Sequence, residues 1–121
     1  MISYITIGSN DLSVSTPFFD TLFGALGGTR AYSLDHMIGY SFGPTTPMII
    51  VTRPFDGKAA TNGNGTMIAL AAKTPRDVDT IHALALEHGA TDEGAPGQRG
   101  KNFYGGYFRD RDGNKFNICR T

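Results

Sequence analysis

The sequence predicts an α+β protein made of two βαβββ modules that together form a cupped mixed sheet. The order of one strand, one helix and three strands occurs twice along the chain. Period-two alternation marks the strands, and apolar residues at three- and four-residue spacing mark the helices. One module has a single helix to cover one sheet face, so the remaining faces must meet each other or a ligand. Two such sheets side by side would make a cup.

Composition limits the classes of protein that the chain can belong to. It has 121 residues, with 11 Lys and Arg, 11 Asp and Glu, and one Cys. This length supports one domain, residues 1–121, with a core that needs no disulfide. The zero formal charge argues against binding to nucleic acid or to an acidic membrane. No apolar run is long enough to span a bilayer, and the first residues alternate like a strand, so we expect a cytoplasmic protein.

The first module is expected over about residues 1–53. Residues 2–7 are β-branched or aromatic and predict a half-buried strand. A helix near 13–27 follows, ended by a Gly pair, and Pro17 is tolerable only if it lies in the first turn. The helix has an apolar face of Val14, Phe18, Leu22, Ala25 and Leu26. Three further strands are predicted at 29–34, 37–42 and 47–52.

A linker of about residues 54–64, rich in Gly, Asn and Pro, precedes the second module at about 65–121. After a strand at 66–72, Thr74 is a good N-cap with Pro75 at the first helical position. The predicted helix, 74–88, has an inward stripe of Val78, Ile81, Ala85 and His88. The remaining elements are a short run at 90–92, a Gly-rich loop at 94–100, and strands at 103–110 and 115–119 joined by a hairpin turn.

The segment 94–107 is the best candidate for a ligand contact. It combines two cations, Arg99 and Lys101, with three aromatic residues that include Tyr104 and Tyr107. A loop so rich in Gly suits a lid or rim that contacts a small anionic ligand. A solvated loop whose aromatic side chains pack underneath remains an open alternative.

The isolated reactive side chains have simpler interpretations. His82 and His88 are six residues apart on a helix, so they point in different directions and cannot share a metal. We expect His82 to be solvated and His88 to stabilise the helix end. His36 is interpreted as a surface histidine in a turn, and Cys119 as a packed thiol.

Several motifs resemble the glyoxalase, bleomycin resistance protein and extradiol dioxygenase superfamily, also called vicinal oxygen chelate proteins. They are the opening strand followed by residues 8–12, the repeated modules, the Gly-Asn-Gly-Thr of 63–66 before a strand, and the Arg-Asp-x-Asp-Gly-Asn-Lys of 109–115. The resemblance covers essentially the whole chain. It implies paired βαβββ modules, a cupped sheet completed in a homodimer, and a small-molecule site inside the cup.

The resemblance also implies where a metal would be held. Metal-using members carry two His and one Glu at positions that match Tyr4, Met67 and Asn117 here. A phenol, a thioether and an amide are poor ligands for a divalent ion, which favours imidazole and carboxylate. The expectation is therefore a chain without the metal site and without a cofactor.

Three hypotheses remain for the function. The first is a metal-independent binding protein for a small aromatic or carboxylated molecule, with Tyr4, Met67, Tyr104, Tyr107 and Asn117 lining the cavity and Arg99 and Lys101 at its rim. The second is a lyase, isomerase or dioxygenase that uses other metal ligands or a tyrosine of altered pKa. The third is a dimeric interaction module without a ligand. A homodimer is expected because the sheets leave apolar faces exposed, and a cationic drug such as bleomycin is disfavoured because the chain has no acidic excess.

Overall fold

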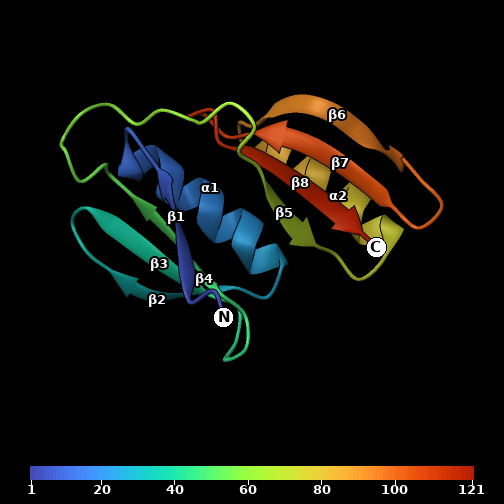
Figure 1. Ribbon diagram of the computed structural model, residues 1–121, viewed down its shortest axis with the longest axis horizontal. Coiled ribbons are helices and arrows are strands. Elements are labelled where there is room, and N and C mark those ends of the chain that lie inside the picture. The colour runs from blue at the N-terminus through green and yellow to red at the C-terminus, as the bar shows by residue number, and fades with distance from the viewer. The chain divides into compact units, whose positions relative to one another are not determined.

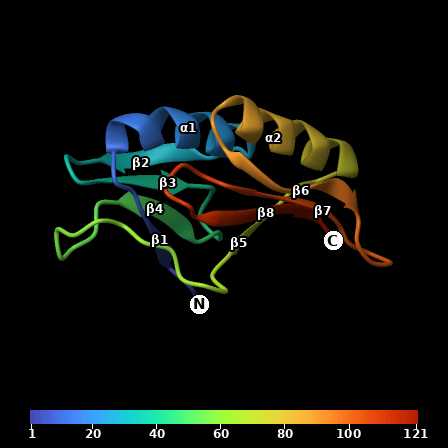
Figure 2. The same ribbon diagram turned by 90° about the horizontal axis from the view of Figure 1, so that it is seen from above.

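The computed structural model describes residues 1–121 and divides them into two compact units, residues 1–61 and 62–121. Each unit has one four-stranded sheet and one helix, which confirms the predicted α+β class and its two βαβββ modules. Figures 1 and 2 show each helix lying along one face of the sheet of its own unit. No helix of the structure combines the length and the apolar character that a membrane crossing requires.

The first unit contains β1 (Tyr4–Gly8), α1 (Leu12–Ala25), β2 (Thr29–Ser33), β3 (Met37–Ser41) and β4 (Met48–Thr52). The strand order is β1-β4-β3-β2, and only the β1 and β4 pair is parallel. Alternation along β3 and β4 directs Tyr40, Ile49 and Val51 toward α1, where they are buried. The Phe23 ring of α1 packs edge-to-face on the Tyr40 ring at 5.0 Å between centroids.

The second unit repeats this topology with β5 (Ile68–Ala71), α2 (Pro75–Glu87), β6 (Thr91–Gln98), β7 (Tyr104–Arg109) and β8 (Lys115–Arg120). Its order is β5-β8-β7-β6, again with one parallel pair, β5 and β8. Thr74 caps α2 by accepting a hydrogen bond from the Asp77 amide at 3.1 Å, as the sequence predicts. Stacked Phe108 and Phe116 rings form the core beneath α2.

Two expectations about backbone elements are wrong. The Gly-rich segment 94–100 is a strand over most of its length, since β6 extends to Gln98 and pairs with β7. Register shifts between Asp92 and Gly97 show that bulges let this Gly-rich stretch stay paired at a sheet edge. In α1, Pro17 lies inside the helix and not in its first turn, because the Asp11 cap starts the helix at Leu12.

The helix faces also differ from the predicted ones. His82 is buried, because its Nε2 lies 3.1 Å from the Tyr107 carbonyl and 3.2 Å from an Asp92 carboxylate oxygen, which offsets the loss of hydration. His88 is exposed beyond the last turn and bonds to the Leu84 carbonyl. Val14 and Ala25 are exposed as well, because the buried stripe of α1 runs through Ser15, Phe18, Phe19, Leu22 and Phe23.

Candidate functional site

The face of the second sheet that points away from α2 carries the densest group of candidate residues. On the helix side, Gly106 of β7 approaches the His82 ring, and Phe108 contacts the same ring. Since side chains alternate along a strand, Tyr107 points to the opposite face. Tyr107 is in register with Asn117 of β8, and Arg109 with Lys115. Tyr107, Asn117 and Lys115 therefore share what we call the open face of the second sheet.

Two cations lie over the Tyr107 ring. The Arg99 guanidinium carbon is 5.0 Å from the ring centroid, and the Lys115 ammonium nitrogen is 5.7 Å from it. Both distances are within the range of cation–π attraction. The Tyr107 ring is thus in contact with two positive groups, and its attraction offsets part of their mutual repulsion.

The Arg99 side chain is fixed by backbone carbonyls. Its guanidinium donates to the carbonyls of Ala95 at 2.5 Å and Gly97 at 3.4 Å, and also to the carbonyl of Gly105. These neutral acceptors orient the group without cancelling its charge. Neither Arg99 nor Lys115 has a carboxylate within 4.0 Å, whereas neighbouring Arg109 is paired with Glu93 at 2.5 Å. The open face therefore carries two positive charges without a carboxylate partner.

Asn117 forms the floor of this group. Its side chain is 1% exposed, and its amide nitrogen donates to the Gly106 carbonyl at 3.0 Å and the Ile118 carbonyl at 3.4 Å. The absence of a side chain at Gly105 makes room for it, because a Cβ there would lie 2.9 Å from that nitrogen. Both bonds use the amide nitrogen, so neither of them involves the side-chain oxygen, which is the hydrogen-bond acceptor of Asn117.

Tyr104 and Lys101 lie elsewhere in the second unit. The Tyr104 hydroxyl donates to an Asp79 carboxylate oxygen of α2 at 2.6 Å, so this side chain is on the helix side of the sheet. The hydrogen bond to Asp79 raises the pKa of Tyr104, so its hydroxyl stays protonated near neutral pH and does not serve as a base there. Lys101 is exposed, and both residues line a pocket of about 450 Å³ that also includes Pro75 and Arg120.

The other two predicted site residues are exposed and lie in separate units. Tyr4, on β1, is 58% exposed, and Met67, just before β5, is 43% exposed. On β1, Ile7 is buried while Tyr4 and Thr6 are exposed, in agreement with the expected alternation. Of the seven predicted residues, the structure brings together Arg99, Tyr107 and Asn117.

The residues at the three expected metal positions do not fit a divalent ion. Asn117 has its amide nitrogen committed to two carbonyls, Met67 offers a thioether, and Tyr4 a phenol that must lose a proton to ligate. The structure contains no group of three or more His, Cys, Asp or Glu side chains arranged to hold a metal ion.

Lys115 is the residue of this group that the sequence interpretation missed. It lies in the predicted last strand, two residues before Asn117, and residues two apart on a strand share a face. The same period that placed Asn117 on the open face would have placed Lys115 beside it. Its cation–π contact with Tyr107 depends on strand register, which the sequence alone did not provide.

Comparison with known proteins identifies the family. Residues 1–118 match the family model of the Glyoxalase/Bleomycin resistance protein/Dioxygenase superfamily, and the chain belongs to this family. A glyoxalase/bleomycin resistance protein from Albidiferax ferrireducens T118 is 35% identical, with a TM-score of 0.91, and the alignment covers 100% of this chain and 98% of that one. No curated protein matches the chain.

More distant structures share the fold. A glyoxalase-related enzyme from Fulvimarina pelagi has a TM-score of 0.81 at 18% identity, covering 98% of this chain and 86% of the other. The fosfomycin resistance protein FosX from Mesorhizobium loti has a TM-score of 0.75 at 17% identity, covering 100% and 92%. The same fold is therefore shared by a protein described as a glyoxalase-related enzyme and by a fosfomycin resistance protein. The fold alone does not define the function of this chain.

Proposed function

We propose that this chain is a metal-independent binding protein for a small organic anion, which it holds on the open face of the second sheet. The observation that carries the proposal is the pair of cations over the Tyr107 ring, Arg99 and Lys115, neither of which has a carboxylate partner. A carboxylated ligand would supply the missing negative charge, and hydrogen bonds between charged groups are stronger than those between neutral ones.

The roles of the individual residues follow from their positions. Backbone carbonyls already orient the Arg99 guanidinium, so it can donate hydrogen bonds to a carboxylate with little further loss of side-chain conformational entropy. Lys115 adds a second, more mobile charge. Tyr107 holds the cations in place, and the Asn117 oxygen offers an acceptor for a hydroxyl or amide of the ligand. Because cations lie over the Tyr107 ring, the ligand is selected by its charge more than by stacking on that ring.

Matched pairs of ligands test this function. We expect benzoate to bind in titration calorimetry and benzamide, which has the same shape without the charge, to bind at least about tenfold more weakly. The double variant Arg99→Gln and Lys115→Gln should lose this preference. Lys73→Gln, which removes an exposed charge elsewhere in the unit, should retain it. Equal binding of benzoate and benzamide by the unmodified protein would contradict the proposal.

A second measurement separates binding from catalysis. A binding protein returns the ligand unchanged, so incubation with aromatic carboxylates, catechols or aldehyde–thiol adducts, with and without added divalent metals, should give no product by mass spectrometry. Product formation that depends on added metal would replace the binding function with an enzymatic one.

A further inference from the structure

A pocket of about 420 Å³ lies in the first unit, outside the site described above. Its lining comes from the residues that follow β1, the residues that follow β4, and the turn between β2 and β3. These segments meet because β1 and β4 are parallel, so that their carboxyl ends lie side by side, and Met37 at the start of β3 pairs with Thr52 at the end of β4. The volume suits a small organic ligand.

The walls of the pocket are tied together by hydrogen bonds between distant parts of the chain. The Asn10 side-chain oxygen accepts the Ala60 amide at 2.8 Å, and its nitrogen donates to the Ala60 carbonyl at 3.5 Å. The Arg53 amide donates to the His36 carbonyl at 2.9 Å, and the Ser9 amide to the Thr52 carbonyl at 2.9 Å. The segment after β4 is thus attached both to the end of β1 and to the β2–β3 turn, which gives the pocket a defined shape.

The chemistry of the lining is cationic. Its charged or chargeable side chains are Arg53, Lys58 and His36, and no Asp or Glu lines the pocket. The Arg53 side chain donates one hydrogen bond, from Nη2 to the Asp35 carbonyl at 2.7 Å, which uses one of the five N–H donors of the guanidinium. In the same segments, Asp11 accepts the Ser13 amide at 3.0 Å and Asp56 accepts the Lys58 amide at 2.9 Å, so these carboxylates cap their own turns.

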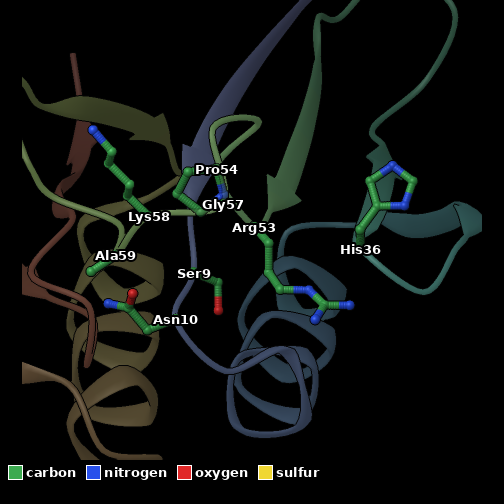
Figure 3. A pocket seen from close by; sticks show the side chains of 8 residues that line it. All are labelled: Ser9, Asn10, His36, Arg53, Pro54, Gly57, Lys58 and Ala59. Carbon is green, nitrogen blue, oxygen red and sulfur yellow. The ribbon is translucent and has the colours of Figure 1, made fainter.

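Figure 3 shows Arg53 and His36 toward one side of the pocket and Lys58 and Ala59 toward the other, with Ser9 between them. The Lys58 ammonium points away from the guanidinium in this view, whereas Arg53 is anchored at the Asp35 carbonyl. The planar guanidinium can bind two oxygens of one anion at once, which a lysine cannot. Arg53 is therefore the main candidate anchor, and Lys58 a flexible contributor.

From this lining we infer that the pocket is a second binding site, for a small organic molecule that carries a compact oxyanion, either a phosphate monoester or a carboxylate. The oxyanion is held by Arg53 with His36 beside it, and the organic part lies against Pro54 and Ala59. This inference does not depend on the proposed function, because the pocket belongs to the first unit and the open face to the second.

Nuclear magnetic resonance titration of the full chain tests the site. The probes are inorganic phosphate, phenyl phosphate and acetate, each followed at the backbone amides of Asn10, Gly57 and Ala59. We expect saturable shifts of these amides, with phenyl phosphate binding more tightly than inorganic phosphate because Pro54 and Ala59 contact the ring. Stronger binding of the phosphates than of acetate would identify a phosphate monoester as the ligand class, and the reverse order a carboxylate.

Variants separate a built site from general attraction of anions. Arg53→Gln should weaken binding about tenfold, Arg53→Lys less, and Lys58→Gln less still. Arg76→Gln, which removes an exposed cation of the second unit, should leave the affinity unchanged. If Arg53→Gln disturbs the fold by losing the Asp35 contact, His36→Gln and Lys58→Gln test the site in its place.

Two results would overturn the inference. One is the absence of saturable shifts at these amides for all three probes up to about 10 mM. The other is an equal loss of affinity in Arg53→Gln and Arg76→Gln, which would mean that the probes sense overall charge and not the pocket.

Discussion

Close packing around Gly105 fixes the position of Asn117 on the open face of the second sheet. A Cβ on Gly105 would lie 2.8 Å from a ring carbon of Phe103 and 2.9 Å from the Asn117 amide nitrogen. Real Cβ atoms do not approach so closely, so one of these neighbours would have to move. The position of Asn117, and with it the floor of the proposed site, depends on this glycine.

We therefore predict that Gly105→Ala destabilises the protein by about 1 to 3 kcal/mol, since overpacking a well-filled site has a cost of this order. Urea unfolding measures the change. Gly24→Ala is the matched control, because nothing lies within 4 Å of a Cβ built there, and alanine in a helix should be neutral or stabilising by about 0.5 kcal/mol. Similar effects of the two substitutions would contradict the packing argument.

The contribution of Asp20 to the stability of the protein should depend on pH. Its carboxylate accepts hydrogen bonds from Arg30 at 2.9 Å and from the buried Tyr40 hydroxyl at 2.8 Å. The hydrogen bond from Arg30 lowers the pKa of Asp20. A carboxyl group with a lowered pKa in the folded state stabilises the protein above its unfolded pKa, and this contribution is lost as the pH falls through the folded value.

Asp20→Asn should consequently reduce the free energy of unfolding at neutral pH, and this effect should shrink as the pH falls through the lowered pKa of Asp20 and the carboxyl group becomes protonated. The loss should stay below about 1 kcal/mol, because the Asp20 and Arg30 side chains are 38% and 44% exposed and solvent screens the pair. Urea unfolding at several pH values measures it. An effect of the same size at both ends of the range would show that charge is not the cause.

At the scale of secondary structure, the elements that the sequence predicts best are those with clear start and stop residues. The α2 helix was predicted within one residue at each end, because Thr74 and Pro75 mark its start and Gly89 its end. The sequence predicts only the start of β6, as a short run at 90–92, and not its extension to Gln98, because Gly and Pro are poor strand residues and only pairing with β7 keeps them extended. His82 was placed in solvent because the sequence does not reveal the Tyr107 carbonyl that accepts its bond.

In the proposed site, too, the sequence predicts features of single strands but not the contacts that depend on strand pairing. Alternation along single strands predicted that Asn117 points away from Phe116 and Ile118. The grouping of Tyr104 with Tyr107 ignored that residues three apart on a strand face opposite sides, and the bond from Tyr104 to Asp79 shows the difference. The approach of Arg99 to Tyr107 arises from the bulged pairing of β6 with β7, which no local pattern encodes.

The α1 helix contains an unfavourable residue whose removal should be measurable. Pro17 lacks the amide hydrogen that would bond within the helix, and its side chain is exposed, so little packing depends on it. We predict that Pro17→Ala stabilises the protein by about 1 to 3 kcal/mol. Pro75→Ala, at the first position of α2, should change stability by less than about 0.5 kcal/mol, because that amide has no helical partner. Thermal unfolding distinguishes the two variants, and equal effects would refute the argument.

At the scale of the whole molecule, the family resemblance leads to a testable prediction about where a metal ion could be bound. The resemblance to the family implies that Tyr4, Met67 and Asn117 match the positions at which metal-using members carry ligands, and that these positions converge. We predict that the triple variant Tyr4→His, Met67→His and Asn117→Glu binds Zn²⁺ or Ni²⁺ in calorimetry far more tightly than the unmodified protein, since two imidazoles and a carboxylate suit these ions. Tyr4→His alone is the control, and equal affinities for both variants would show that the three positions do not converge.

Assembly is a second prediction at this scale. Large apolar side chains are exposed at the start of the first unit, where Ile2 is 56% and Tyr4 is 58% exposed. Apolar surface of this kind favours self-association. We predict a homodimer, seen in light scattering as twice the 13.0 kDa mass of one chain. A single-chain mass at every micromolar concentration would contradict it.

The strand order of the two sheets determines how long the first strand of each unit stays unpaired while the chain is being translated. In each unit the first strand lies at the sheet edge and its one sheet partner is the last strand, so β1 pairs only with β4, and β5 only with β8. As the chain leaves the ribosome, Ile5 and Ile7 emerge long before Ile49 and Val51, their partners in the sheet. During translation the apolar opening strand of each unit therefore remains without its partner until that unit has been made almost completely. In that interval its backbone hydrogen-bonding groups and apolar side chains are open to contact with other chains.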